Sequence, residues 1–243
     1  MLISGSRVSD ALARMTKIYF MLKFITGNKT KFKEVQAVLT PIKIKQVNID
    51  LVEIQELDPR KIIEHKLRGA FKHRRGEFIQ HLPKIPSGLL RGRMGLKIET
   101  SVEFDDEGAG FIIDDSSLYL KCFDYKLPGP LVKWFNDSIG SKGYANLVKR
   151  MGENRAKAKT IIGYAKNPKS ILFFEGNLNG KVVAPRGTYN FGYDPIFVAD
   201  GKRETLSQTK AKGDFESSPR GIAVLKLKKY LLKKIKYHDF NGR

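Results

Sequence analysis

The chain has 243 residues, of which 41% are hydrophobic and 10% aromatic, and its 45 Lys and Arg outnumber its 25 Asp and Glu to give a net charge of +20. This composition excludes wholesale disorder and predicts one large folded domain, while the charge predicts attraction to polyanions such as nucleotides, nucleic acid or anionic membranes without choosing among them. A single cysteine, Cys122, and four histidines exclude a disulfide framework and a zinc cluster, and the lack of a long apolar run excludes a transmembrane helix, so we expect a cytoplasmic protein with no membrane partner.

Residues 1–20 precede the first core strand and are predicted to be a disordered N-terminal extension. Arg7, Arg14, several serines and one acid, Asp10, give this extension a weak resemblance to an organellar transit peptide. A frayed extension without a targeting role is the alternative, and the sequence does not separate the two.

A strand, a tight turn and a helix are predicted in that order from residue 22. Residues 22–26 are β-prone, Gly27-Asn28 supplies turn chemistry, and apolar residues then recur at helical spacing. Free backbone N–H groups and the helix dipole favour an anion at such a junction, with Lys31 within reach of it and Glu34 as a counter-charge on the same face. An ordinary turn carrying a surface Lys31–Glu34 pair is the alternative, and no Walker-type glycine loop is present.

A second strand is predicted over residues 42–51, followed by a helix that starts at Asp58-Pro59 with the aspartate as N-cap. Residues 72–110 break the pattern with a basic cluster, several prolines and glycines, and an acidic turn at 105–108. We interpret this stretch as a basic insert in a domain that spans residues 21–237, with a tail at 238–243.

Acidic residues follow two of the predicted strands. Asp114 and Asp115 end a buried strand that starts at Gly110 and precede Ser116, and Glu53 follows the second strand. We expect these acids at one end of a sheet, where ligand sites of α/β proteins lie, and Mg²⁺ accepts one or two carboxylates together with substrate phosphates. A helix N-cap or a polar turn is the alternative explanation of Asp114-Asp115.

In the C-terminal half, the sequence predicts a rigid, proline-containing turn at 127–130, a helix from residue 132, a strand at 160–165 and a hairpin. In that hairpin, strands at 171–175 and 181–184 flank a loop at 176–180 that is rich in Gly and Asn. The stretch from Arg186 to Pro195 brings Phe191 and Asp194 together, so an aromatic face could stack a purine while a carboxylate reads its edge; a core-capping turn is the alternative. A lysine-rich amphipathic helix is predicted over residues 221–237.

Four blocks in this order resemble the ITP/XTP pyrophosphatase family, also called the HAM1 or inosine triphosphatase family: residues 26–34 (TGNKTKFKE), 113–118 (IDDSSL), 127–135 (LPGPLVKWF) and 183–195 (VAPRGTYNFGYDP). The resemblance implies an elongated α/β fold with a mixed central sheet flanked by helices, two lobes around a central cleft, and a homodimer. It implies a Mg²⁺-dependent hydrolase that converts abnormal purine nucleoside triphosphates, such as ITP, dITP and XTP, to the monophosphate and pyrophosphate and so cleanses the nucleotide pool.

The resemblance also implies residue roles. Asp115 and Lys31 would be catalytic, and Glu53 and Asp115 would hold the metal. The substrate-binding residues would be Thr26, Gly27, Asn28, Lys31, Lys66, Ser116 and Lys133 around the triphosphate, and Phe191, Gly192, Tyr193, Asp194, Lys212 and Arg220 around the base.

Two features depart from the family pattern. The chain has Ser218-Pro219-Arg220 where the family has Ser-His-Arg, with a longer loop from Lys212 to Arg220, and the insert near 72–110 is absent from the family at this size. The preferred base is therefore open. Two other functions also stay open: a basic nucleic-acid-binding protein on a retained or degenerate pyrophosphatase scaffold, and a pyrimidine nucleotide pyrophosphatase of the Maf type.

Overall fold

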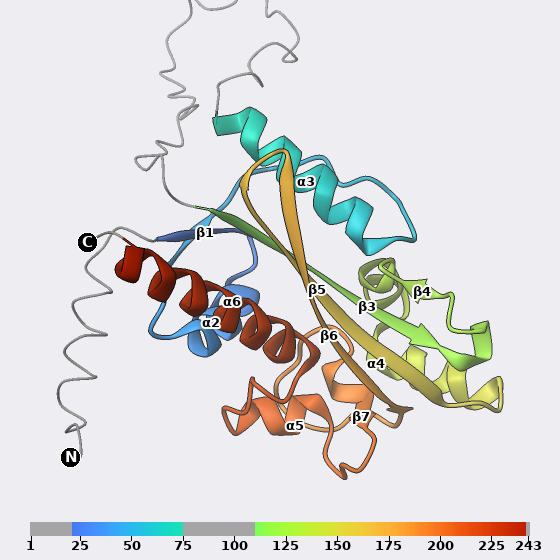
Figure 1. The fold of residues 1–243 in the computed structure, drawn as a ribbon. Coiled ribbons are helices and arrows are strands. Elements are labelled where there is room, and N and C mark those ends of the chain that lie inside the picture. Colours follow the sequence, from blue (N-terminus) through green and yellow to red (C-terminus); the bar gives the residue numbers. More distant parts are fainter. Residues whose placement is uncertain (1–20, 75–109, 242–243) are drawn as a thin grey trace, which may run out of the picture.

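The computed structural model describes residues 21–74 and 110–241 (Figure 1). The predicted extension 1–20 and nearly all of the predicted insert near 72–110 lie outside these residues. Within the described part, seven strands form one mixed sheet in the order β2-β1-β3-β5-β6-β7, with β4 beside β3. The strands are β1 Leu22–Ile25, β2 Ile44–Val47, β3 Phe111–Leu120, β4 Pro128–Gly129, β5 Arg155–Asn167, β6 Ser170–Val182 and β7 Phe197–Ala199.

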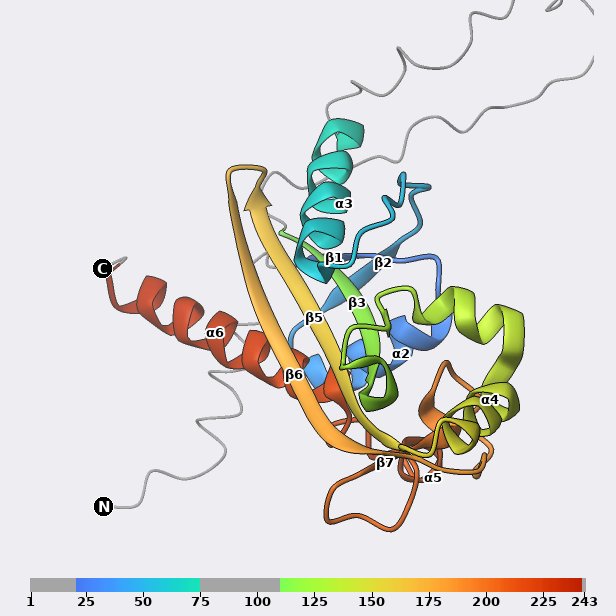
Figure 2. The same ribbon diagram turned by 90° about the vertical axis from the view of Figure 1, so that its right-hand side faces the viewer.

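Strand β1 runs parallel to β2 and β3, and the other pairs are antiparallel. The helices are α2 Lys29–Leu39, α3 Pro59–Arg74, α4 Val132–Arg150, α5 Leu206–Ala211 and α6 Pro219–Asn241. Helices α2 and α6 cover one face of the sheet and α3 covers the other (Figures 1 and 2). Alternate residues of β3 fill the two cores: Ile112 packs with α2 and α6, whereas Phe111 and Ile113 pack with α3.

A separate hydrophobic core lies at the other end of the long strands. There Leu118 and Leu120 of β3 pack with Tyr144 of α4, Phe197 of β7 and Leu206 of α5. The predicted mixed sheet with flanking helices and two lobes is therefore confirmed. None of the described helices is long and apolar enough to cross a bilayer.

The predicted hairpin loop at residues 176–180 is wrong, because β6 runs through it without a break and pairs with β5 from residue 170. The turn between the strands lies instead at residues 168–169. A Cβ atom on Gly176 would collide with the backbone oxygen of Pro219, and one on Gly180 with that of Val198. These glycines allow α6 and β7 to approach the strand closely, which explains a loop-like composition inside a strand.

Three predicted boundaries also change. Strand β2 covers only Ile44–Val47 of the predicted 42–51, and α3 continues to Arg74, so the first residues of the predicted insert are helical. Helix α6 starts at Pro219 and continues to Asn241, beyond the predicted end at residue 237 and into the predicted tail. The predicted cap of α3 is confirmed, since Asp58 Oδ1 accepts a hydrogen bond from the Arg60 amide at 2.9 Å.

Candidate functional site

A break in strand pairing along one edge of β3 marks the candidate site. Strand β3 pairs with β1 at Phe111 and Ile112 and with β4 at Leu118 and Tyr119, and residues 113–117 between them have no strand partner on this edge. A cavity of about 510 Å³ opens here, lined by residues from both lobes. The carboxylates therefore lie in the middle of β3, and the prediction that they end a strand is wrong.

The cavity brings together the predicted site residues Thr26, Gly27, Asn28, Lys31, Glu53, Lys66, Asp115, Ser116, Lys133, Phe191, Gly192, Tyr193, Asp194 and Arg220. Lys212 is the exception. Its side chain is 66% exposed and pairs with Glu204 at 2.6 Å, outside the cavity lining. The contact of Lys212 with the base therefore stays a prediction, which its position in this structure does not favour.

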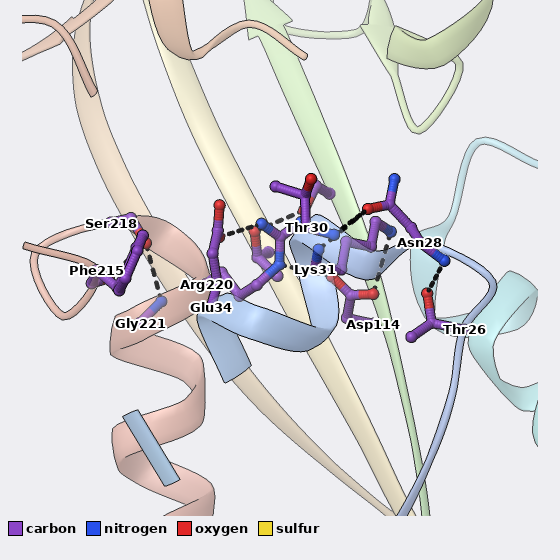
Figure 3. A network of polar contacts seen from close by, with 12 residues as sticks. Thr26, Asn28, Thr30, Lys31, Glu34, Asp114, Phe215, Ser218, Arg220 and Gly221 are labelled. Carbon is purple, nitrogen blue, oxygen red and sulfur yellow. Dashed lines mark hydrogen bonds and ion pairs between the residues drawn. The ribbon is translucent and has the colours of Figure 1, made fainter. Parts of the chain in front are cut away.

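The N-terminus of α2 forms one wall of the cavity. Asn28 caps the helix: its Oδ1 accepts hydrogen bonds from the amides of Thr30 at 2.9 Å and Lys31 at 3.1 Å, and its own amide donates to Thr26 Oγ1 at 3.1 Å (Figure 3). The expectation that these first-turn amides are free is therefore wrong. A phosphate bound here would replace the Asn28 side chain at the two amides, in a turn that is already ordered.

Asp114 holds two of the cations in place. Its Oδ1 accepts from Lys31 Nζ at 3.0 Å and its Oδ2 from Arg220 Nε at 2.8 Å (Figure 3). Burial alone would raise the pKa of Asp114, but Lys31 and Arg220 outweigh it and lower that pKa to about 2. The predicted Lys31–Glu34 pair is wrong, because Lys31 bonds to Asp114 and Glu34 turns toward other partners.

Glu34 instead joins a buried ionic network. Its carboxylate accepts from Arg220 Nη1 at 2.5 Å, from Lys210 Nζ at 3.1 and 3.2 Å, and from the Tyr189 hydroxyl at 2.9 Å. Burial alone would raise the pKa of Glu34, but the charges of Arg220 and Lys210 outweigh burial and hold that pKa below its usual value. Lys210 also donates to Asp194 Oδ2 at 2.7 Å, although burial keeps the pKa of Asp194 above its usual value.

Lys210 is a site residue that the sequence reasoning missed. It is 4% exposed and lines the cavity where Lys212 was expected. A local signal exists: Thr205 and Gln208 form a capping box that fixes the start of α5, and Lys210 then lies four residues after the buried Leu206, on the same inward face.

Asp115 projects to the opposite face of β3 from Asp114 and has a different environment. Burial raises the pKa of Asp115 to about 6, against the opposing charges of Lys31 and Lys66. Its Oδ2 accepts a long hydrogen bond of 3.4 Å from Ser117 Oγ. A buried carboxylate with such weak support from donors is suited to binding a cation or accepting a proton.

Glu53 supplies a second carboxylate to the same cavity. It is 58% exposed, and its Oε1 accepts from Lys66 Nζ at 2.6 Å. Lys31, Lys66 and Glu53 all act electrostatically on Asp115, so the residues predicted from separate segments do converge. Two hard oxygen ligands in one cavity fit Mg²⁺, which takes one or two carboxylates and completes its shell with water and phosphate oxygens.

The turn before the short 3₁₀ helix η4, Asp194–Ile196, also lines the cavity. Phe191, Gly192, Tyr193 and Asp194 all line it, and Gly192 has a positive φ of 53°. The guanidinium carbon of Arg220 lies 5.2 Å from the centroid of the Phe191 ring. Arg220 thus contacts both the carboxylates of Asp114 and Glu34 and the ring of Phe191.

Comparisons with known proteins identify relatives of this chain. The profile of the Ham1 family matches residues 87–230. The inosine triphosphate pyrophosphatase of Podospora anserina is 32% identical over 225 residues, which cover 91% of this chain and 99% of that protein. The inosine triphosphate pyrophosphatase of Schizosaccharomyces pombe is 31% identical over 210 residues, covering 86% and 93%.

Two solved structures share the fold. The HAM1 protein from Coxiella burnetii superposes with a TM-score of 0.63 at 19% identity and covers 89% of this chain and 100% of its own. The Ham1 protein of Staphylococcus aureus gives a TM-score of 0.60 at 18% identity, with 88% and 99% covered. Sequence relatives along almost the whole chain and a shared fold lead to one conclusion: the protein belongs to the Ham1 family.

Proposed function

We propose that the protein hydrolyses ITP-type purine nucleoside triphosphates to the nucleoside monophosphate and pyrophosphate. The observation that carries this proposal is the convergence of Lys31, Lys66, Glu53 and Asp115 in one cavity that the Phe191–Asp194 turn also lines. The cations and carboxylates are suited to binding a triphosphate with its metal ion, and the aromatic turn is suited to stacking against a purine. The names of the relatives from Podospora anserina and Schizosaccharomyces pombe support the same activity.

The residues of the phosphate end can perform this hydrolysis together. Lys31, Lys66 and Lys133 neutralise the triphosphate and the negative charge that develops on the leaving pyrophosphate. Asp115, which lines the same cavity, orients the attacking water and accepts its proton. Attack at the α-phosphorus breaks its bond to the oxygen that bridges the α- and β-phosphates, and pyrophosphate leaves.

Glu53 and Asp115 are the residues that would hold Mg²⁺. When bound, Mg²⁺ would add positive charge at the phosphate oxygens to that of Lys31, Lys66 and Lys133. Lys66, which pairs with Glu53 at 2.6 Å, would then be released toward the phosphates.

Positive charge also bears on base selection. Arg220 and Lys210 both line the cavity near Phe191. The guanidinium of Arg220 keeps N–H groups beyond its bonds to Asp114, Glu34 and Ser116, and such a donor favours the 6-oxo group of hypoxanthine or xanthine, whereas the 6-amino group of adenine would be a donor facing a donor. The comparisons do not favour the two alternative functions, a nucleic-acid-binding protein and a Maf-type pyrimidine nucleotide pyrophosphatase.

The activity is tested by incubating the protein with ITP, XTP, dITP, ATP or dTTP and MgCl₂ while pyrophosphate and orthophosphate are measured separately. We expect pyrophosphate from ITP, XTP and dITP, far less from ATP and dTTP, and loss of activity when a chelator removes the metal. Orthophosphate as the direct product, or dTTP as the best substrate, would contradict the proposal.

The homodimer and the cytoplasmic location stay predictions. Sedimentation equilibrium tests the first, since a dimer gives twice the mass of the 27.5 kDa chain. Imaging of the tagged full-length chain tests the second, with an organellar signal as the outcome that would favour the transit-peptide interpretation of residues 1–20.

A further inference from the structure

Helix α4 contributes an uncommitted hydrogen-bond acceptor to the cavity. The Oδ1 atom of Asn136 is buried and has no hydrogen-bond partner among the described residues, and Asn136 lines the cavity. A buried carbonyl oxygen without a donor is unfavourable, so such an atom at a ligand site is suited to a donor that the ligand brings.

The position of Asn136 identifies which part of the ligand it would meet. Its Nδ2 atom lies 3.7 Å from the point where a Cβ atom of Gly192 would be, so the amide is beside the Phe191–Asp194 turn. Phe191, Gly192, Tyr193 and Asp194 of this turn line the same cavity as Asn136, so the amide lies beside the residues that we assign to the base.

Other polar side chains near this turn already have protein partners. Asp194 accepts from Lys210 at 2.7 Å, and Arg220 donates to Asp114, Glu34 and Ser116. Pro219, which also lines the cavity, has no polar side-chain atom. Asn136 Oδ1 is a buried acceptor without a protein partner among the described residues, so we expect it to meet a donor on the edge of the base.

We propose that Asn136 is a specificity-determining residue whose Oδ1 accepts a hydrogen bond from N1–H of a 6-oxopurine. The inference rests on the proposed function and adds the atom that recognises the base. Hypoxanthine, xanthine and guanine carry a hydrogen on N1, whereas N1 of adenine is itself an acceptor. The contact therefore separates 6-oxopurines from adenine, because two acceptors would face each other when ATP binds.

The test compares kcat/KM for ITP, ATP and purine riboside triphosphate, which lacks both N1–H and the 6-oxo group. Asn136→Leu keeps the size of the side chain but removes the acceptor, and Asn136→Asp keeps an acceptor. We expect Asn136→Leu to lower kcat/KM for ITP by about 10–100-fold and to change that for purine riboside triphosphate by less than about threefold. Asn136→Asp should keep most of the preference for ITP over ATP.

Asn146→Leu is the matched control, since it makes the same substitution at an exposed position of the same helix. It should leave all three kcat/KM values unchanged. The inference would be overturned if the ratio of kcat/KM for ITP to kcat/KM for purine riboside triphosphate is the same in Asn136→Leu as in the wild type. This holds whether neither value falls or both fall equally, and the proposed function would remain intact. Failure of the wild type to hydrolyse any of the three would instead reject the proposed function, and the inference with it.

Discussion

Replacing Glu34 with glutamine removes a buried charge that holds Arg220 and Lys210. The Glu34 side chain is 1% exposed and accepts four hydrogen bonds from three donors, at 2.5 to 3.2 Å. Glutamine has the same size, but it loses the charge and turns an N–H group toward the cations. Breaking a buried ion pair from one side costs about 3–5 kcal/mol, so we expect the free energy of unfolding at pH 7 to fall by that amount and Tm to fall by about 6–20 °C.

Urea denaturation followed by circular dichroism measures this loss, with Glu64→Gln as the matched control. Glu64 pairs with Arg68 at 2.6 Å, but both side chains are exposed, so the control should lose less than about 0.5 kcal/mol. The pKa of Glu34 is lowered from its ordinary value of 4.5. The stability that ionised Glu34 contributes is therefore complete above pH 4.5 and is lost as the pH falls through its folded-state pKa. The difference in free energy of unfolding between wild type and Glu34→Gln should therefore become smaller in acid. A loss at pH 7 no larger than that of the control would refute the buried network.

Further substitutions test the remaining assignments. Lys210→Met should lower the free energy of unfolding by about 3–5 kcal/mol, whereas Lys212→Met should change it by less than about 1 kcal/mol. Equal losses of stability in the two variants would contradict the assignment of Lys210, and not Lys212, to the buried ionic network. Gly176→Ala should destabilise the fold by about 1–3 kcal/mol in thermal melts, because the new methyl group meets the backbone oxygen of Pro219, and an unchanged Tm would count against that close packing. Lys31→Ala should lower kcat for ITP by about 10²–10³-fold with the native circular dichroism spectrum retained, and a rate near wild type would remove Lys31 from the catalytic residues.

Local patterns predicted much of the fold. The cap at Asp58-Pro59 marked the start of α3, and Gly27-Asn28 marked the junction between β1 and α2. The same reasoning failed at Gly176 and Gly180, because glycine serves equally for a turn and for close approach of another backbone. Only the positions of Pro219 and Val198 in space distinguish these two uses, and neither is local in sequence.

Local sequence patterns placed side chains of the candidate site on their own elements but did not reveal partners that are distant in the sequence. Lys31 was placed correctly on the first turn of α2, but its partner is Asp114, 83 residues away, and not the neighbouring Glu34. Lys210 is 176 residues from Glu34, and a local pattern cannot reveal such a pair. Because side chains alternate along β3, Asp114 bonds to Lys31 and Arg220 on one face while Asp115 lies on the other, where we propose that hydrolysis takes place. This difference can be predicted only when both residues are known to lie inside the strand.

The turnover number of Asp115→Asn with ITP and Mg²⁺ tests most directly whether the carboxylate in this cavity performs the hydrolysis. Asparagine keeps the shape of the side chain but cannot accept the proton of the attacking water. We predict that kcat for pyrophosphate release falls by at least about 10²-fold while the circular dichroism spectrum stays native. A natively folded Asp115→Asn protein that releases pyrophosphate at the wild-type rate would contradict the assignment.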